Sequence, residues 1–169
     1  MFPHATLEIT DGSRRLEKIL RLERSCDYSV HDLSRVQLDP AKLRVPRFNM
    51  PFALGLYCGR CQPAERPETK LVCLRGGGER VDKSLSDLKG TDPKIHGATV
   101  RGVLSGLCND FKRPGRQPSV PQMMQIYREL RKNQAAILKE AGSDTPYTKR
   151  VFTDFCMVAS SEAERIVEN

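Results

Sequence analysis

The stretch CDYSVHDLSRVQLDPAKLRVPRFNMPFALGLY, residues 26–57, decides the fold of this chain. Its first part, DYSVHDL, is rich in β-branched and aromatic residues and predicts a strand that ends at an acidic group, Asp32. After a proline-containing loop, a mostly apolar run predicts a helix with Asn49 as its N-cap and Pro51 in its first turn. Ligands of open α/β sheets bind beyond the carboxyl ends of the strands, so we expect Asp32 and Asn49 beside a ligand site.

Strand and helix patterns alternate along the chain as far as residue 112. Short apolar runs predict strands at residues 5–9 and 70–75, the second of them buried. Such alternation favours an α/β fold, with a small parallel sheet flanked by helices and right-handed crossovers. The remaining predicted elements are helices at residues 11–24, 79–90 and 98–112 and loops at residues 58–69 and 91–97.

The last third of the chain has only helical patterns. The run KRPGRQPSVP, residues 112–121, contains three prolines and predicts a linker. Beyond it, apolar residues recur at helical spacing in two segments separated by AGSDTPY, which predicts an antiparallel helical hairpin. We therefore expect an α/β domain at residues 1–113 and a C-terminal helical hairpin at residues 119–169.

Composition narrows the class of protein. The chain of 169 residues carries 28 basic and 21 acidic residues, a net charge of +7 that could attract phosphate-bearing partners. The basic residues form no long run, tryptophan is absent and aromatic residues make up 6%, which disfavours a nucleic-acid binder. No apolar run approaches the roughly 20 residues of a membrane span, and the N-terminus lacks a signal-peptide layout. We expect a cytoplasmic protein whose six cysteines are reduced thiols.

Three blocks of this sequence carry a family resemblance: YSVHDLSR at Tyr28–Arg35, RFNMPFALGL at Arg47–Leu56 and SDLKGTDPKIH at Ser86–His96. Together they resemble a bacterial family of nucleotide-binding proteins with a TIR-like, nucleoside 2-deoxyribosyltransferase-like fold. The likeness covers about residues 5–112. It implies a flavodoxin-like sheet and hydrolysis or transfer at the N-glycosidic bond of a nucleotide such as NAD.

The chain departs from this family in two places. The family motif F-E-L-G carries a glutamate at the start of a helix, where its carboxylate acts on the ribose as nucleophile or stabilises positive charge. Ala53 stands at that position here and can do neither. The family also begins with a strand, a ligand-contacting loop and a helix before a segment that this chain reaches at residues 5–9. The resemblance therefore predicts a catalytically impaired domain without its first strand and helix.

Seven residues are candidates for nucleotide binding, and each has a structural alternative. Asp32 could accept a ribose hydroxyl or close an Asx turn, and Ser34 could bind ligand or close the same turn. Asn49 could bind ligand or only cap its helix, and Arg47 could bind a phosphate or be an exposed surface arginine. Asp92 and His96 could bind ligand or form a structural network within their loop. Glu8 could face the same pocket. His31 alternates away from Asp32 on the pleat and is not expected in the same site. The candidates are Glu8, Asp32, Ser34, Arg47, Asn49, Asp92 and His96.

Two further motifs are weaker indications. Cys58 and Cys61 form a C-x-x-C pair, but zinc requires four ligands and no second pair exists, so we predict no metal site. The glycines of residues 76–78 follow a predicted strand but match no phosphate-loop spacing, and we interpret them as a flexible turn.

The sequence leaves three functions open. The first is a nucleotide- or nucleoside-binding domain related to NAD glycohydrolases and deoxyribosyltransferases, impaired by Ala53. The second is a non-enzymatic interaction or sensor module that acts in a homo-oligomer. The third, ranked last, is a basic nucleic-acid-binding protein, for which the sequence offers neither a recognition helix nor an aromatic cluster.

Overall fold

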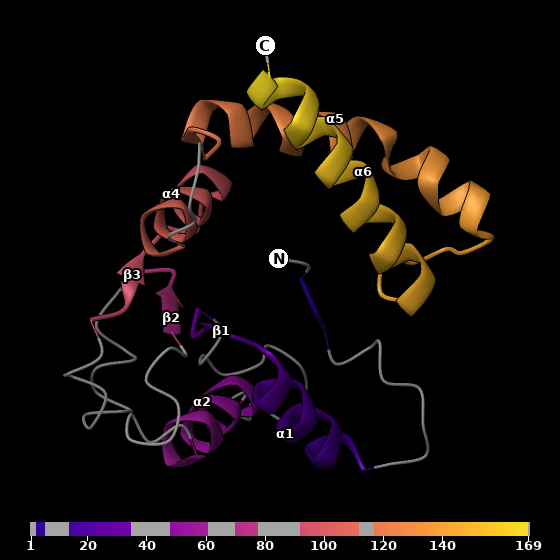
Figure 1. Ribbon diagram of the computed structural model, residues 1–169. Helices are drawn as coiled ribbons and strands as arrows, with labels where there is room; N and C mark the ends of the chain where they lie inside the picture. Colours follow the sequence, from indigo (N-terminus) through magenta and orange to yellow (C-terminus); the bar gives the residue numbers. More distant parts are fainter. Residues whose placement is uncertain are drawn as a thin grey trace, which may run out of the picture. The chain divides into compact units, whose positions relative to one another are not determined.

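The structure is a computed structural model that describes residues 3–5, 14–34, 48–60, 70–77, 92–111 and 117–168. The chain forms two compact units, residues 19–110 and residues 1–18 together with 111–169 (Figure 1). Parallel strands and helices alternate in the first unit, which confirms the predicted α/β class. No helix in the described ranges is long and apolar enough to cross a membrane.

The sheet of the described residues has three parallel strands in the order β1-β2-β3. They are β1 (Tyr28–Asp32), β2 (Lys70–Arg75) and β3 (Lys94–Ile95). The first two were predicted, and β2 is central and buried, as its continuous apolar run indicated. The prediction of a loop throughout residues 91–97 was wrong, because two residues of it pair with the end of β2.

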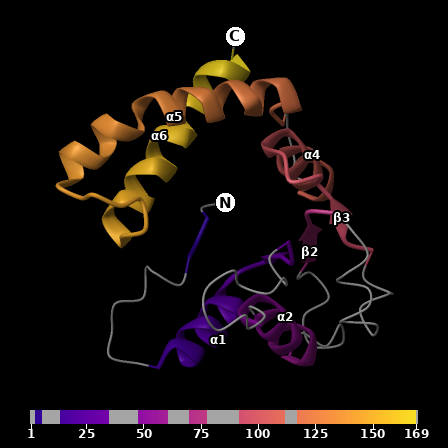
Figure 2. The same cartoon turned by 180° about the vertical axis from the view of Figure 1, so that it is seen from behind.

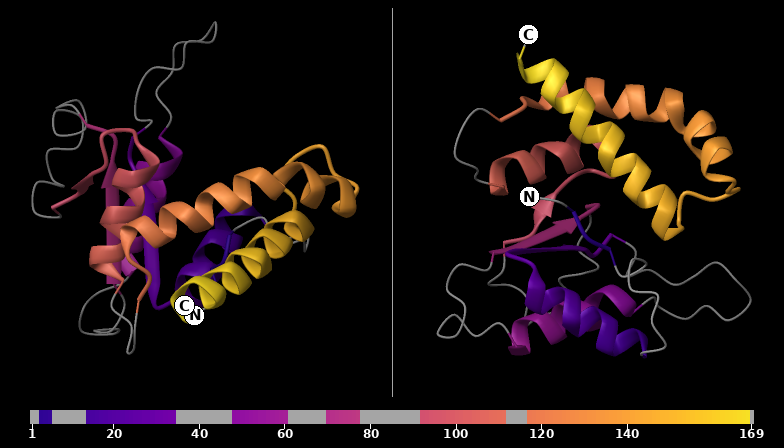
Figure 3. Two further views of the ribbon diagram at one scale, coloured as in Figure 1. Left: turned by 90° about the horizontal axis from the view of Figure 1, so that it is seen from above. Right: turned by 45° about the vertical axis from the view of Figure 1, so that its right-hand side comes forward.

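Helices cover opposite faces of this sheet (Figure 3). From α2 (Asn49–Arg60), Leu54 packs against Leu33 and Cys73 to form a buried core. From α4 (Val100–Asp110), Gly106 approaches Leu74 on the other face, since consecutive residues of a strand point to opposite sides. The central strand is therefore covered by a helix on each face.

The start of α2 differs from the prediction by one residue. Phe48 accepts the first intrahelical hydrogen bond, at 2.8 Å from the Phe52 amide nitrogen, so the cap lies at Phe48 and Asn49 is already helical. Pro51 falls in the first turn, where its missing N–H has no partner to lose. The helix also continues through Arg60, so Cys58 lies in a helix and not in the predicted loop.

Helix α4 begins at Val100, two residues later than predicted, because the preceding residues make a turn. Gly97 and Ala98 have φ values of 58° and 55°, in the left-handed region. Thr99 then caps the helix: its carbonyl accepts from the Val103 amide at 3.1 Å and its hydroxyl accepts from the Gly102 amide at 3.1 Å.

The helical hairpin of the other unit consists of α5 (Val120–Ala141) and α6 (Lys149–Glu168). Ser119 and Gln122 form a capping box, so α5 includes the last two residues of the predicted linker. At the other end of α5, Gly142 adopts a left-handed conformation with φ 62° and ends the helix. Gln122 Nε2, near the start of α5, donates to the carbonyl of Ile166 near the end of α6 at 3.2 Å. The two helices are therefore antiparallel, as predicted (Figure 2).

The remaining predictions are only partly covered by the described residues. The helix predicted at residues 11–24 is confirmed as α1 (Arg15–Ser25), which spans the boundary between the two units. The strand predicted at residues 5–9, apart from Ala5, and the helix predicted at residues 79–90 lie outside the described residues.

The close approach of α4 to the turn at His96 leads to a stability prediction. A methyl group at Gly102 would lie 2.1 Å from the carbonyl oxygen of His96, a contact with backbone that cannot move aside easily. We expect Gly102→Ala to lower the free energy of unfolding by about 2 kcal/mol or more. Gly55, in α2, is the matched control, because a methyl group there would meet nothing within 4 Å.

We expect Gly55→Ala to raise the free energy of unfolding by about 0.5–1 kcal/mol, since alanine is the better helix former. Urea denaturation of both variants measures the two effects. Equal stability of the two variants would contradict the close packing of α4 against the His96 turn.

Candidate functional site

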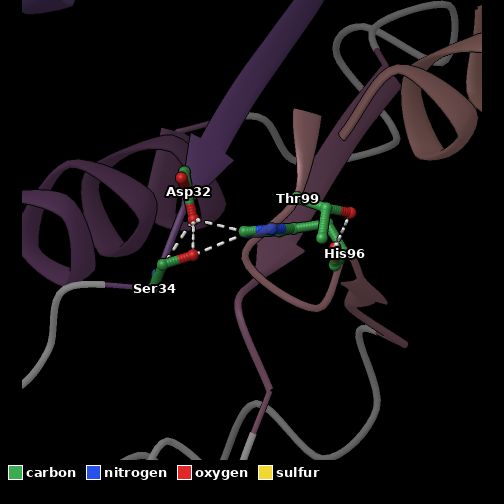
Figure 4. A network of polar contacts seen from close by, with 4 residues as sticks. All are labelled: Asp32, Ser34, His96 and Thr99. Carbon is green, nitrogen blue, oxygen red and sulfur yellow. Dashed lines mark hydrogen bonds and ion pairs between the residues drawn. The ribbon is translucent and has the colours of Figure 1, made fainter. Parts of the chain in front are cut away.

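Three polar side chains meet at the carboxyl end of the sheet (Figure 4). Asp32 is the last residue of β1, Ser34 follows it by two residues, and His96 comes directly after β3. Asp32 Oδ1 accepts hydrogen bonds from the Ser34 hydroxyl and from the Ser34 amide, the latter at 2.9 Å. His96 Nε2 lies 2.7 Å from Ser34 Oγ and 3.5 Å from Asp32 Oδ1.

This Asp32–Ser34–His96 cluster joins two strands that are not neighbours. Because β2 lies between β1 and β3, the contact passes over the end of β2, where the chain continues as Gly76. A methyl group at Gly76 would lie 3.3 Å from Ser34 Oγ and 3.8 Å from His96 Cε1. Glycine at this position therefore lets the two side chains meet across the central strand.

We assign the protons of the cluster from its hydrogen bonds. A serine hydroxyl has one proton, and Ser34 donates it to the carboxylate of Asp32. His96 must then donate its Nε2–H to Ser34 Oγ, which leaves Nδ1 without a proton in the neutral ring. Nδ1 of His96 is buried and has no hydrogen-bond partner in the described part of the chain.

This arrangement differs from a Ser-His-Asp catalytic triad. In a triad the histidine accepts the serine proton, and the carboxylate binds the other ring nitrogen. In this cluster the carboxylate of Asp32 accepts from Ser34 itself, and Nδ1 of His96 has no carboxylate partner among the described residues. The geometry suits hydrogen bonding to a ligand and does not activate Ser34 as a nucleophile.

Asp32 is the charged member of the cluster. Its partial burial by itself would raise the pKa of the carboxyl group, but hydrogen bonds from the hydroxyl and amide of Ser34 and the contact with His96 outweigh that effect. The pKa of Asp32 is therefore lower than usual, and the group is ionised at neutral pH. Its side chain is 49% exposed, so a ligand can reach the carboxylate.

The other predicted site residues are placed differently. Asp92 precedes β3, whereas His96 follows it, so the two lie at opposite ends of that strand even though one sequence block contains both. Asn49 is exposed at the start of α2, and Ala53 is half-buried one turn further along. Glu8 and Arg47 lie outside the described residues.

Sequence reasoning missed three residues that shape the cluster: Gly76, Thr99 and Gly102. Thr99 before an apolar helical run is a typical N-cap signal, but nothing local indicates that the same hydroxyl contacts the His96 carbonyl. The closeness of the two glycines to His96 depends on the packing of separate elements and has no signal in the sequence.

His31 occupies the opposite face of the sheet, as the pleat predicted. Its Nε2 lies 2.7 Å from Ser29 Oγ, and its ring packs against that of Tyr57 in α2, with centroids 5.7 Å apart. Only 4% of the residue is exposed, and burial lowers the pKa of its imidazole to about 4. His31 is therefore a neutral part of the core.

Similarity to known proteins does not identify the site. No protein-family model matches the chain, and neither a curated protein nor a solved structure matches it significantly. Within the described ranges, no three histidine, cysteine or acidic side chains are grouped so that they could hold a metal ion. The chemistry of the site therefore follows from the side chains of the Asp32–Ser34–His96 cluster.

The buried state of His31 predicts a pH-dependent stability. The unfolded chain takes up a proton at His31 below about pH 6.5, whereas the folded chain does so only near its pKa of about 4. Stability is therefore lost as the pH falls from 6.5 toward 4. Between pH 7 and pH 4.5 this single group should remove about 2–3 kcal/mol from the free energy of unfolding.

Urea denaturation at both pH values measures this loss in the wild type, in His31→Gln and in His4→Gln. His4 is exposed, so its replacement is the control. We expect the loss to shrink in His31→Gln and to persist in His4→Gln. A loss of equal size in all three proteins would show that His31 is not the responsible group.

Proposed function

We propose that this chain is a nucleotide- or nucleoside-binding α/β domain whose ligand binds at the Asp32–Ser34–His96 cluster. One observation carries the proposal: the three side chains converge at the carboxyl ends of parallel strands. Ligands of open α/β sheets bind at this edge. The resemblance of the blocks around Tyr28–Arg35 and Arg47–Leu56 to nucleotide-binding proteins supports the same ligand class.

The donor and acceptor set suggests which part of the ligand binds there. Within the described residues, the contacts of Asp32 all involve Oδ1, and the half-exposed carboxylate has Oδ2 available as an acceptor. An ionised carboxylate accepts hydrogen bonds from hydroxyl groups and repels phosphates. The cluster therefore suits the ribose of a nucleotide, and the phosphates would bind elsewhere.

The same proposal includes weak or absent catalysis. Cleavage of an N-glycosidic bond builds positive charge on the ribose, which a nearby carboxylate stabilises. Ala53 has no such group, Ser34 is not arranged as a nucleophile, and the Asp32 carboxylate is assigned here to the ribose hydroxyl groups and not to the anomeric carbon. Binding without efficient turnover is the function that this set of side chains supports best.

Ligand titration tests the binding site. We expect NAD and nicotinamide riboside to bind to the wild type, and Asp32→Asn to weaken both by about tenfold or more, because a charge-assisted hydrogen bond is lost. Isothermal titration calorimetry measures the dissociation constants. Asp92→Asn is the matched control, since it removes the same charge at the other end of β3 and asparagine tolerates the left-handed φ of 48° at that position.

Two results would overturn the assignment. One is the absence of saturable binding of either probe to the folded wild type at millimolar concentration. The other is an equal loss of affinity in Asp32→Asn and Asp92→Asn, which would indicate a general charge effect and no contact at the cluster.

Catalytic impairment is tested by restoring the missing carboxylate. We expect no NAD hydrolysis above background in the wild type, and release of nicotinamide by Ala53→Glu about a hundredfold faster than by Ala53→Gln. Glutamine has the same size and lacks the charge, so the comparison isolates the carboxylate. Chromatographic measurement of nicotinamide checks this. Rapid hydrolysis by the wild type would refute the claim that Ala53 removes activity.

A further inference from the structure

The hydroxyl group of Thr99 contacts the turn that carries His96 (Figure 4), and it also contacts the helix that Thr99 caps. Thr99 Oγ1 donates to the carbonyl oxygen of His96 at 3.0 Å and accepts from the amide of Gly102 at 3.1 Å. The Thr99 amide donates to the same carbonyl oxygen at 3.1 Å. One side chain thus links the start of α4 to the backbone of a cluster residue.

The backbone of His96 is held from two sides. Its amide donates to the carbonyl of Arg75 at 2.9 Å, which anchors it to β2, and its carbonyl is held by Thr99. Between His96 and Thr99 the chain passes through Gly97 and Ala98, both left-handed. That conformation is unfavourable for an alanine, by about 1 kcal/mol or more. The hydrogen bonds from Thr99 to the His96 carbonyl therefore hold the turn against the preference of Ala98 for another backbone conformation.

We propose that Thr99 is a positioning residue of the ligand site, which acts through His96. Its hydroxyl holds the turn in the conformation that places His96 Nε2 at 2.7 Å from Ser34 Oγ. Loss of the hydroxyl lets the imidazole move away from Ser34 and Asp32 and changes the proton arrangement of the cluster. The effect on ligand affinity rests on the proposed function, whereas the effect on His96 does not.

A helix cap that acts only on stability makes a different prediction. Ser119 caps α5 in the other unit by accepting from the amide of Gln122, far along the chain from the cluster. Loss of either cap lowers the stability of its helix. Loss of the Thr99 hydroxyl alone should also disturb His96.

The experiment compares Thr99→Val, Thr99→Ser and Ser119→Ala with the wild type. Valine keeps the shape of threonine without its hydroxyl, serine keeps both hydrogen bonds, and Ser119→Ala removes a cap elsewhere. The chain has three histidines, so NMR of selectively labelled imidazoles resolves them, and the His96→Gln variant assigns the signal. The same proteins are titrated with NAD by calorimetry.

In Thr99→Val we expect the His96 nitrogen signals to lose the pattern of a ring protonated at Nε2, with NAD affinity about three- to tenfold weaker. Thr99→Ser should restore both, and Ser119→Ala should leave both unchanged. Unaltered His96 signals in folded Thr99→Val would overturn the proposal. If His96 responds but no protein binds NAD, the positioning role stands and the proposed function fails.

Discussion

The hydrogen bond between Ser34 and His96 is the contact on which the candidate site depends, because it closes the carboxyl end of the sheet. Strand β3 has two residues and pairs with β2 at Leu74 and Arg75, so the ladder alone holds it weakly. The bond from His96 to Ser34, 2.7 Å long, ties it to β1 as well. The glycine after β2 leaves room for this bond, and the ionised Asp32 orients the Ser34 hydroxyl.

The two buried histidines of the sheet show how position determines chemistry. His31 faces the apolar core under α2, where burial keeps its imidazole neutral, and it contributes shape and one hydrogen bond. His96 is almost as buried, at 7% exposure, but its Nε2 lies 3.5 Å from a carboxylate. His96 therefore lies within reach of a carboxylate and a hydroxyl group, whereas the polar side chain beside His31 Nε2 is the Ser29 hydroxyl. This contrast supports the proposal that the ligand binds at the carboxyl end of the sheet.

The sequence predicted those elements that show an apolar run or a periodic pattern within their own residues. The apolar run of β2 and the periodicity of α5 and α6 follow from burial of one strand and of one stripe on each helix. The two-residue strand β3 has no periodicity to detect. Asp32 and His96 were both candidates, but their contact depends on strand order, which a single sequence does not reveal. Asp92 was grouped with His96 because both belong to the third block of the family resemblance, and the strand between them separates the two.

The proposed loss of catalysis is physically compatible with an intact binding geometry. The hydrogen bonds that shape the cluster run among β1, β3 and the start of α4, and none of them involves position 53. Ala53 is half-buried in α2 beside Leu54, where alanine is the best helix former and a carboxylate would have to be partly desolvated. A glutamate there would therefore act against stability, and its replacement by alanine would leave the scaffold at least as stable. Under the proposed function, ligand recognition and bond cleavage can thus be separated, because they would depend on different elements.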